Sequence, residues 1–205
     1  TSRTDELGKD GAMISITRLG SIRVRLRHLV CDLADDCGGV AATEFAFIVP
    51  LMLVMFFGTV EFCSALAVQR KVTVMARTLS DLTSQSTSVG DSDITNFFAA
   101  SSGIMYPYAT SPLNSTITEL YVDPNTKQAT VKWSKGSAQR ATGTTVAIPA
   151  ALLVSGTYLI FSEVAYQYVP TIGYVMAKAG VNLSDVAYTR PRQSACVFYA
   201  PATSC

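Results

Sequence analysis

The clearest pattern in the chain is an apolar run from Val40 to Val60, VAATEFAFIVPLMLVMFFGTV, in which Glu44 is the one charged residue. A helix of this length extends roughly 31 Å at about 1.5 Å per residue, close to the thickness of a bilayer's hydrocarbon core. Pro50 lies inside the run, and membrane helices tolerate proline as a kink. The pattern predicts a transmembrane helix over residues 40–60.

Two other interpretations of this run are a buried helix of a soluble protein and a secretory signal peptide. A buried helix is seldom so uniformly apolar. The apolar part of a signal peptide is shorter, about 7–15 residues, and ends in a small-residue cleavage site. Residues 61–82 instead continue the helical pattern. We therefore expect an anchor that stays in the chain.

Basic residues flank the run on both sides. Arg18, Arg23, Arg25, Arg27 and His28 lie shortly before it, and Arg70, Lys71 and Arg77 follow it. The larger group on the N-terminal side favours a cytoplasmic N-terminus under the positive-inside rule. We expect residues 1–39 to form a partly disordered cytoplasmic leader.

Beyond the run, the pattern indicates that the helix continues into water as residues 61–83. An apolar stripe with spacings of four, three, four and three follows one helical face: Val68, Val72, Met75, Leu79 and Leu82. Two heptads are too few to indicate a coiled coil, so we expect this stripe to pack on the protein's own sheet. A coiled-coil partner face is the alternative.

The remaining chain alternates turn signals with strand patterns. We expect a polar linker at 84–93, a short helix from Ser92 or Asp93 to Ala100, a hairpin of 117–122 and 128–133, and strands at 157–169 and 184–189. Residues 136–145 are expected to be a flexible connection. Trp133 is expected to be a core anchor, and Glu163 a solvent-facing or hairpin-paired residue. The fold class is α+β: one long N-terminal helix packed on a small, mainly antiparallel sheet of about four strands. An extracytoplasmic domain spans 84–192, and a C-terminal tail spans 193–205.

Composition argues against several functional classes. The net charge of +1 does not indicate a nucleic-acid partner, and the 15% of charged residues suits a chain with a lipid-facing segment. His28 is the single histidine, and the sequence contains no metal-binding cluster, nucleophile–base set, P-loop or dinucleotide motif. We therefore expect no enzyme activity, no metal and no cofactor.

The five cysteines fall on both sides of the apolar run. Cys31 and Cys37 would lie in the reducing cytoplasm, and Cys63 at the outer edge of the membrane. Cys196 and Cys205 would lie outside, where oxidising conditions allow a disulfide across the eight residues between them. The alternative is a pair of free thiols on a frayed tail.

A glycine and a glutamate stand in a fixed relation at the start of the run. Gly39 is followed by Ala41-Ala42 and, at the fifth position, by Glu44-Phe45; Pro50 and Gly58-Thr59-Val60-Glu61 come later. A carboxylate inside a membrane helix is costly and is by default a functional residue, although a place in the headgroup layer is the simpler interpretation. This arrangement resembles the TadE-like pseudopilins of Tad (Flp) pilus systems. The likeness extends, in degenerate form, to Glu163–Pro170 and Tyr188–Arg192.

The resemblance implies a role in pilus assembly. It implies cleavage by a prepilin peptidase after Gly39, which would make Val40 the new N-terminus. Glu44, with Phe45 beside it, would then pair with the terminal amine of a neighbouring subunit. The implied partners are membrane lipid, other pilin-like subunits, inner-membrane pilus assembly proteins and the peptidase. The implied location is the bacterial inner membrane, with the C-terminal domain periplasmic. The alternative function is an uncleaved, single-pass envelope protein whose domain binds a partner or ligand.

Overall fold

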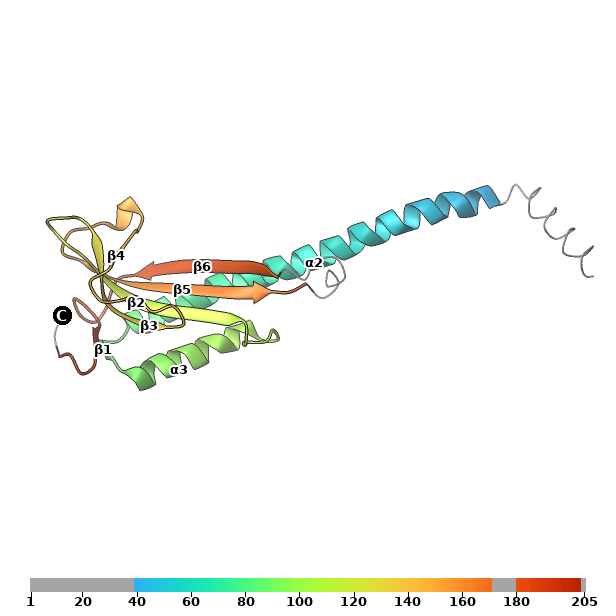
Figure 1. The fold of residues 1–205 in the computed structure, drawn as a ribbon. Coiled ribbons are helices and arrows are strands. Elements are labelled where there is room, and N and C mark those ends of the chain that lie inside the picture. The colour runs from blue at the N-terminus through green and yellow to red at the C-terminus, as the bar shows by residue number, and fades with distance from the viewer. Residues whose placement is uncertain (1–38, 171–179, 204–205) are drawn as a thin grey trace, which may run out of the picture. The chain divides into compact units, whose positions relative to one another are not determined.

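The computed structural model describes residues 39–170 and 180–203, and its elements confirm the α+β class (Figure 1). The chain divides into two compact units, Thr1–Phe56 and Phe57–Cys205. The helices are α2 (Gly39–Ser84) and α3 (Asp91–Ser102), with short 3-10 turns η1 (Gly103–Met105) and η2 (Ala150–Leu152). The strands are β1 (Ser88–Val89), β2 (Leu113–Val122), β3 (Ala129–Gly136), β4 (Thr145–Val146), β5 (Tyr158–Tyr168), β6 (Val181–Thr189) and β7 (Phe198–Tyr199).

Five of the described strands form one antiparallel sheet in the order β4-β3-β2-β5-β6. The predicted hairpin is β2–β3, and its turn is held by Asp123, whose Oδ1 accepts hydrogen bonds from the backbone N–H groups of Asn125 (2.7 Å) and Thr126 (3.1 Å). The β2–β3 register passes from Glu119 opposite Trp133 to Leu120 opposite Val131. A bulge therefore falls at this point of the hairpin.

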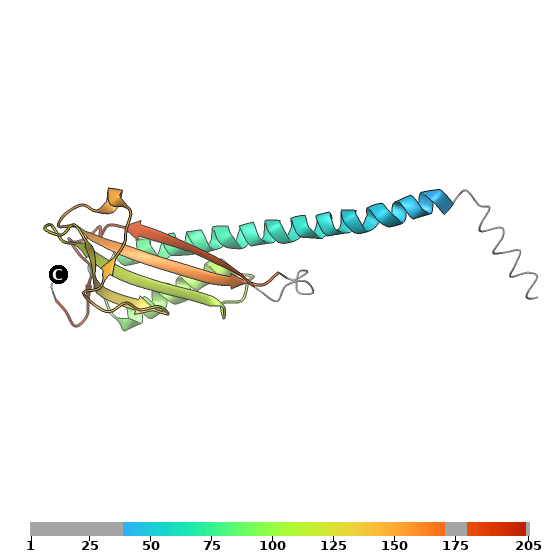
Figure 2. The same ribbon diagram turned by 45° about the horizontal axis from the view of Figure 1, so that its top comes forward.

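Both helices pack against one face of this sheet, α2 by its residues from Phe57 onward (Figure 2). The predicted stripe packs on the protein's own sheet, as expected: Val68, Val72, Met75 and Leu79 are fully buried, and Leu82 is half-buried. Their neighbours in this core from α3 and the sheet include Ile94, Ile117, Trp133, Ile160 and Val164.

Small and hydroxyl-bearing residues lie where α2 meets β5. The Ser162 hydroxyl donates a hydrogen bond to the Ala76 carbonyl (2.6 Å), and the Ser80 hydroxyl donates one to the Ile160 carbonyl (3.2 Å). All four residues are buried. These contacts join helix and sheet backbones through short side chains and satisfy buried hydroxyl groups at the same time.

The opposite face of the sheet is also covered. Leu120, Val131, Leu159 and Phe161 are buried there, beneath the half-buried side chains of Val146, Ile148, Leu152 and Leu153. The flexible connection predicted at 136–145 is thus partly wrong, because Thr145 begins strand β4, which pairs with β3. Within this connection Arg140 forms a bidentate ion pair with the half-buried Glu163.

The polar linker predicted at 84–93 is also partly wrong. Ser88 and Val89 form β1, which pairs in parallel with β7, and Val89 is buried. The following helix begins at Asp91, earlier than expected, with Gly90 as its N-cap residue. Asp93, a predicted cap residue, instead accepts the Gly90 N–H on its carboxylate (2.8 Å) from inside the first turn. This contact satisfies a backbone donor at the helix start.

Candidate functional site

The residues predicted to carry function lie at the start of α2, within the first unit. Gly39 is the first helical residue, and a Cβ at this position would meet no atom within 4 Å. Val40 is 58% exposed, and its carbonyl accepts a hydrogen bond from the Thr43 hydroxyl (2.8 Å). The bond predicted to be cleaved therefore lies at the N-terminal end of the helix.

Glu44 and Phe45 follow one turn later, and both are exposed. Residues four apart share a helical face, so Val40 and Glu44 lie on the same side of α2. Pro50 lies inside the helix and cannot donate to the Ala46 carbonyl. Thirteen large apolar side chains between Val40 and Phe62 are exposed in this stretch: Val40, Phe45, Phe47, Ile48, Leu51, Met52, Leu53, Val54, Met55, Phe56, Phe57, Val60 and Phe62. Glu44 is the one charged residue from Val40 to Val60, and a carboxylate on such an apolar surface suits lipid contact together with a cationic partner.

Among the described residues, α2 is the one helix long and apolar enough to cross a membrane. Residues 39–79 match the family model of the TadE-like protein. This stretch is a TadE-like segment. It contains both the exposed apolar surface with Glu44 and the buried stripe as far as Leu79. No curated protein and no solved structure matches the chain.

The TadE-like segment and its apolar helix indicate a membrane-anchored subunit associated with a Tad pilus. The match covers about a fifth of the chain and ends before the sheet begins. The likeness noted at Glu163–Pro170 and Tyr188–Arg192 lies outside it and stays a prediction. In the parts of the chain that the structure describes, no group of three His, Cys, Asp or Glu residues is placed to hold a metal ion.

The predicted C-terminal tail contains residues that sequence reasoning did not single out. Val197 is fully buried, and both of its backbone polar groups bind side chains of the β2–β3 hairpin. Its N–H donates to Glu119 Oε1 (2.6 Å), and its carbonyl accepts from Trp133 Nε1 (2.7 Å). Trp133 is thus the buried anchor that was expected, with its indole N–H satisfied. These three residues form the Glu119–Trp133–Val197 cluster.

Glu119 is the buried acid of this cluster, with 2% of its surface exposed. Burial raises the pKa of its carboxyl from an ordinary value of 4.5 to about 7. The Val197 N–H, the Trp133 side chain and the positive charge of Lys132 act in the opposite direction. Desolvation therefore dominates over hydrogen bonding at this site.

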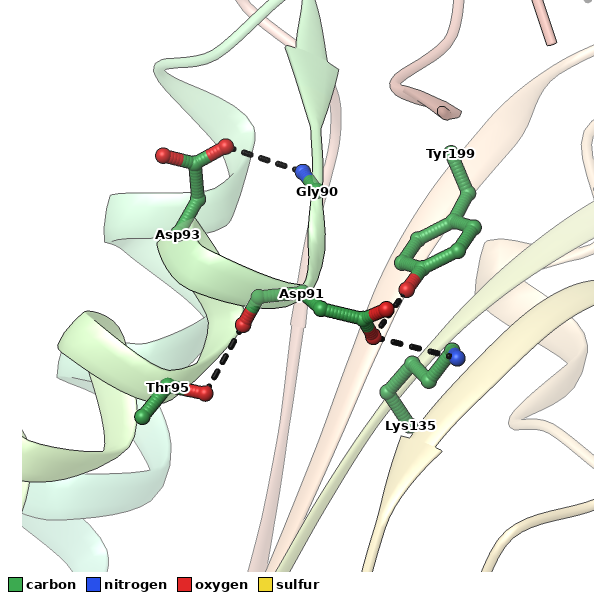
Figure 3. Close-up of polar contacts among 6 residues, drawn as sticks. All are labelled: Gly90, Asp91, Asp93, Thr95, Lys135 and Tyr199. Atoms are coloured by element: carbon green, nitrogen blue, oxygen red, sulfur yellow. Dashed lines mark hydrogen bonds and ion pairs between the residues drawn. The ribbon is translucent and has the colours of Figure 1, made fainter. Parts of the chain in front are cut away.

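Tyr199, two residues after Val197, contacts Asp91 and Lys135 at the surface of the domain (Figure 3). The Tyr199 hydroxyl donates a hydrogen bond to Asp91 Oδ1, and Lys135 Nζ lies 3.3 Å from the same oxygen. The Lys135 ammonium also lies 4.4 Å from the centroid of the Tyr199 ring. The pKa of Asp91 is lowered, first by the Tyr199 hydrogen bond and then by Lys135. These contacts join α3, β3 and β7.

The cysteines are partly described. Cys196 is buried and disulfide-bonded, whereas Cys63 is exposed and free. Cys205 lies outside the described residues, so its pairing with Cys196 stays a prediction. The apolar triplet Val197-Phe198-Tyr199 after Cys196 is the sequence signal that could have indicated a buried C-terminal strand.

Proposed function

We propose that this chain is a minor, pilin-like subunit in the assembly of a Tad/Flp-type pilus. The observation that carries the proposal is the TadE-like match over a helix that presents Glu44 among exposed apolar side chains. The proposed location is the bacterial inner membrane, with the N-terminus in the cytoplasm and the sheet domain in the periplasm. The proposed role is structural and not enzymatic.

The proposed assembly step depends on charge in lipid. Cleavage after Gly39 would create an ammonium group on Val40. A carboxylate or an ammonium alone is costly within a bilayer, whereas a pair of opposite charges offsets much of this cost. The Val40 amine of one subunit and Glu44 of its neighbour would therefore fix the axial register between the two helices. Phe45 would pack beside this pair.

Intact mass measurement of the membrane-extracted protein, from cells with and without their prepilin peptidase, tests the processing step. We expect a product that starts at Val40 and that is lost without the peptidase. A protein that keeps its leader in both strains would contradict processing. It would favour instead an uncleaved envelope protein whose domain binds a partner or ligand.

Membrane extracts of cells that carry variants of this chain test the role of Glu44. Glu44→Gln should reduce recovery of other pilin-like subunits with this chain by at least about tenfold, because breaking a buried ion pair costs about 3–5 kcal/mol. Thr43→Val is the matched control, since the Thr43 hydroxyl bonds within its own helix. Equal recovery with both variants would contradict the proposed pairing.

A further inference from the structure

Among the residues that the structure describes, three segments at one end of the sheet domain carry no charged residue. They are the connection from α3 to β2 (103–112), the end of β5 with the following residues (165–170), and the start of β6 (180–184). We call these three segments the base of the domain. The β2–β3 turn contrasts with them, since it carries Asp123 and Lys127.

Contacts place the base beside the part of α2 that follows the predicted membrane segment. The Tyr168 hydroxyl donates to Glu61 Oε2 (3.0 Å), and Lys71 Nζ donates to the carbonyls of Ile104 (2.9 Å) and Tyr106 (2.8 Å). Figure 1 shows the connection after α3 and the end of β5 at the same end of the sheet. The base therefore lies along residues 61–71 of α2.

The rise of an α-helix, about 1.5 Å per residue, gives the depth of residues 61–64 relative to the bilayer. Glu61 is the first residue after the predicted span of 40–60, and Ser64 lines a cavity of about 360 Å³ together with Tyr108, Tyr166 and Val169. Residues 61–64 rise only about 2–6 Å beyond the span, and the headgroup layer is about 5–7 Å thick on each side. With residues 40–60 across the hydrocarbon core, the end of β5 therefore lies at the depth of the lipid headgroups.

The side chains at the base suit this depth. Tyr106 is 81% exposed, and Val169 and Val181 are each about half exposed. Tyr108 is half-buried at the same end, whereas Tyr166 and Tyr168 are buried in the core there. Tyrosine is enriched at membrane–water interfaces because it presents an apolar ring and a polar hydroxyl. Charged groups, which hold a surface in water, are missing from these segments.

We propose that the end of β5 in the base of the domain, with Val169 exposed there, rests in the headgroup layer of the bilayer that α2 enters. Its partner is the lipid surface itself. Tyr106 lies farther from the predicted span, because its carbonyl binds Lys71, which is about 16 Å along the helix beyond residue 60. The inference rests on the membrane anchoring in the proposed function. It adds a second contact with lipid, which would restrict tilting of the domain about the helix.

A fluorescence experiment on the full chain tests this contact. The chain would be reconstituted into phosphatidylethanolamine–phosphatidylglycerol vesicles that contain a lipid with a nitroxide on its headgroup. Tyr106→Trp and, separately, Val169→Trp place reporters at the base. Val154→Trp is the matched control, because Val154 is 42% exposed and precedes β5 at its other end. The unaltered chain gives the background from Trp133.

We expect the nitroxide lipid to quench Val169→Trp at least about twofold more than Val154→Trp, since β5 spans roughly 35 Å between the two ends. Quenching of Tyr106→Trp should be intermediate, because Tyr106 lies beside Lys71, farther along the helix from the span. Equal quenching at all three sites, in chains that float with the vesicles, would overturn the headgroup contact and leave anchoring intact. Failure of the unaltered chain to float with the vesicles would contradict the anchoring itself, and this inference with it.

Discussion

The buried carboxylate of Glu119 allows a quantitative prediction of how stability depends on pH. Glu119 is almost inaccessible to solvent, and burial raises its pKa from 4.5 to about 7. In the unfolded chain this carboxyl ionises near its ordinary pKa. The folded protein therefore binds more protons at this site than the unfolded chain between about pH 4.5 and pH 7.

The sign and size of the effect follow from proton linkage. Where the folded state binds more protons, the free energy of unfolding falls as the pH rises. The difference between 4.5 and about 7 corresponds to about 3 kcal/mol, at about 1.4 kcal/mol for each pKa unit. The stability that neutral Glu119 provides is thus complete below pH 4.5, decreases through this window and is lost above about pH 7.

The assay is urea denaturation of the full chain in detergent micelles at intervals from pH 4.5 to pH 8. The fluorescence of Trp133 reports on this part of the fold, because Trp133 is opposite Glu119 in the hairpin. Glu119→Gln keeps a carbonyl oxygen for the Val197 N–H but does not ionise. It should match the wild type near pH 4.5 and exceed it by about 3 kcal/mol at pH 8.

Glu119→Ala separates the charge from the hydrogen bond. It also removes the ionisable group, but it leaves the buried Val197 N–H without its acceptor. This variant should be less stable than Glu119→Gln by about 1–3 kcal/mol at every pH. A wild-type stability that changes with pH in the same way as that of Glu119→Gln would refute the reasoning, because the difference between the two isolates the Glu119 carboxyl.

Two further predictions concern the core and the disulfide. Leu79→Ala should lower the free energy of unfolding by about 2–5 kcal/mol in urea denaturation, because Leu79 is fully buried. Val74→Ala, at an exposed position of the same helix, should change it by less than about 0.5 kcal/mol, and equal effects would argue against the assigned helix face. Non-reducing peptide mapping should recover Cys196 linked to Cys205 and Cys63 alkylated. A link from Cys196 to Cys31 or Cys37 would show that the predicted pairing is wrong.

The elements with strong periodicity were predictable from the sequence. The stripe from Val68 to Leu79 identified the buried face of α2, and alternation with a clear turn identified the β2–β3 hairpin. Short pairings were not predictable, since β1, β4 and β7 contain two residues each. Two residues carry no periodicity, and their pairing depends on contacts with segments far away in the chain.

In the candidate site, too, residues in a local sequence motif could be predicted, whereas residues placed by contacts between distant segments could not. Gly39, Glu44 and Pro50 belong to a local motif; the family match at 39–79 supports the resemblance that this motif indicated, and the roles of these residues stay predictions. Glu119 has no comparable signal, because a glutamate in an alternating strand is usually exposed to solvent. Its burial results from the C-terminal segment, 78 residues further along, which covers the end of the helix-side core.

A carboxyl group at position 119 provides the hydrogen-bond acceptor for the buried backbone N–H of Val197. β7 pairs through two residues only, and Val197, which precedes it, takes its hydrogen bonds from side chains. An apolar residue at position 119 would avoid the desolvation of a carboxylate but would leave the buried Val197 N–H unpaired, at a cost of about 1–3 kcal/mol. That cost is close to the roughly 3 kcal/mol by which ionised Glu119 is disfavoured. At about pH 4.5 and below, neutral Glu119 accepts the Val197 N–H without this penalty, and its advantage over an apolar residue decreases as the pH rises towards 7.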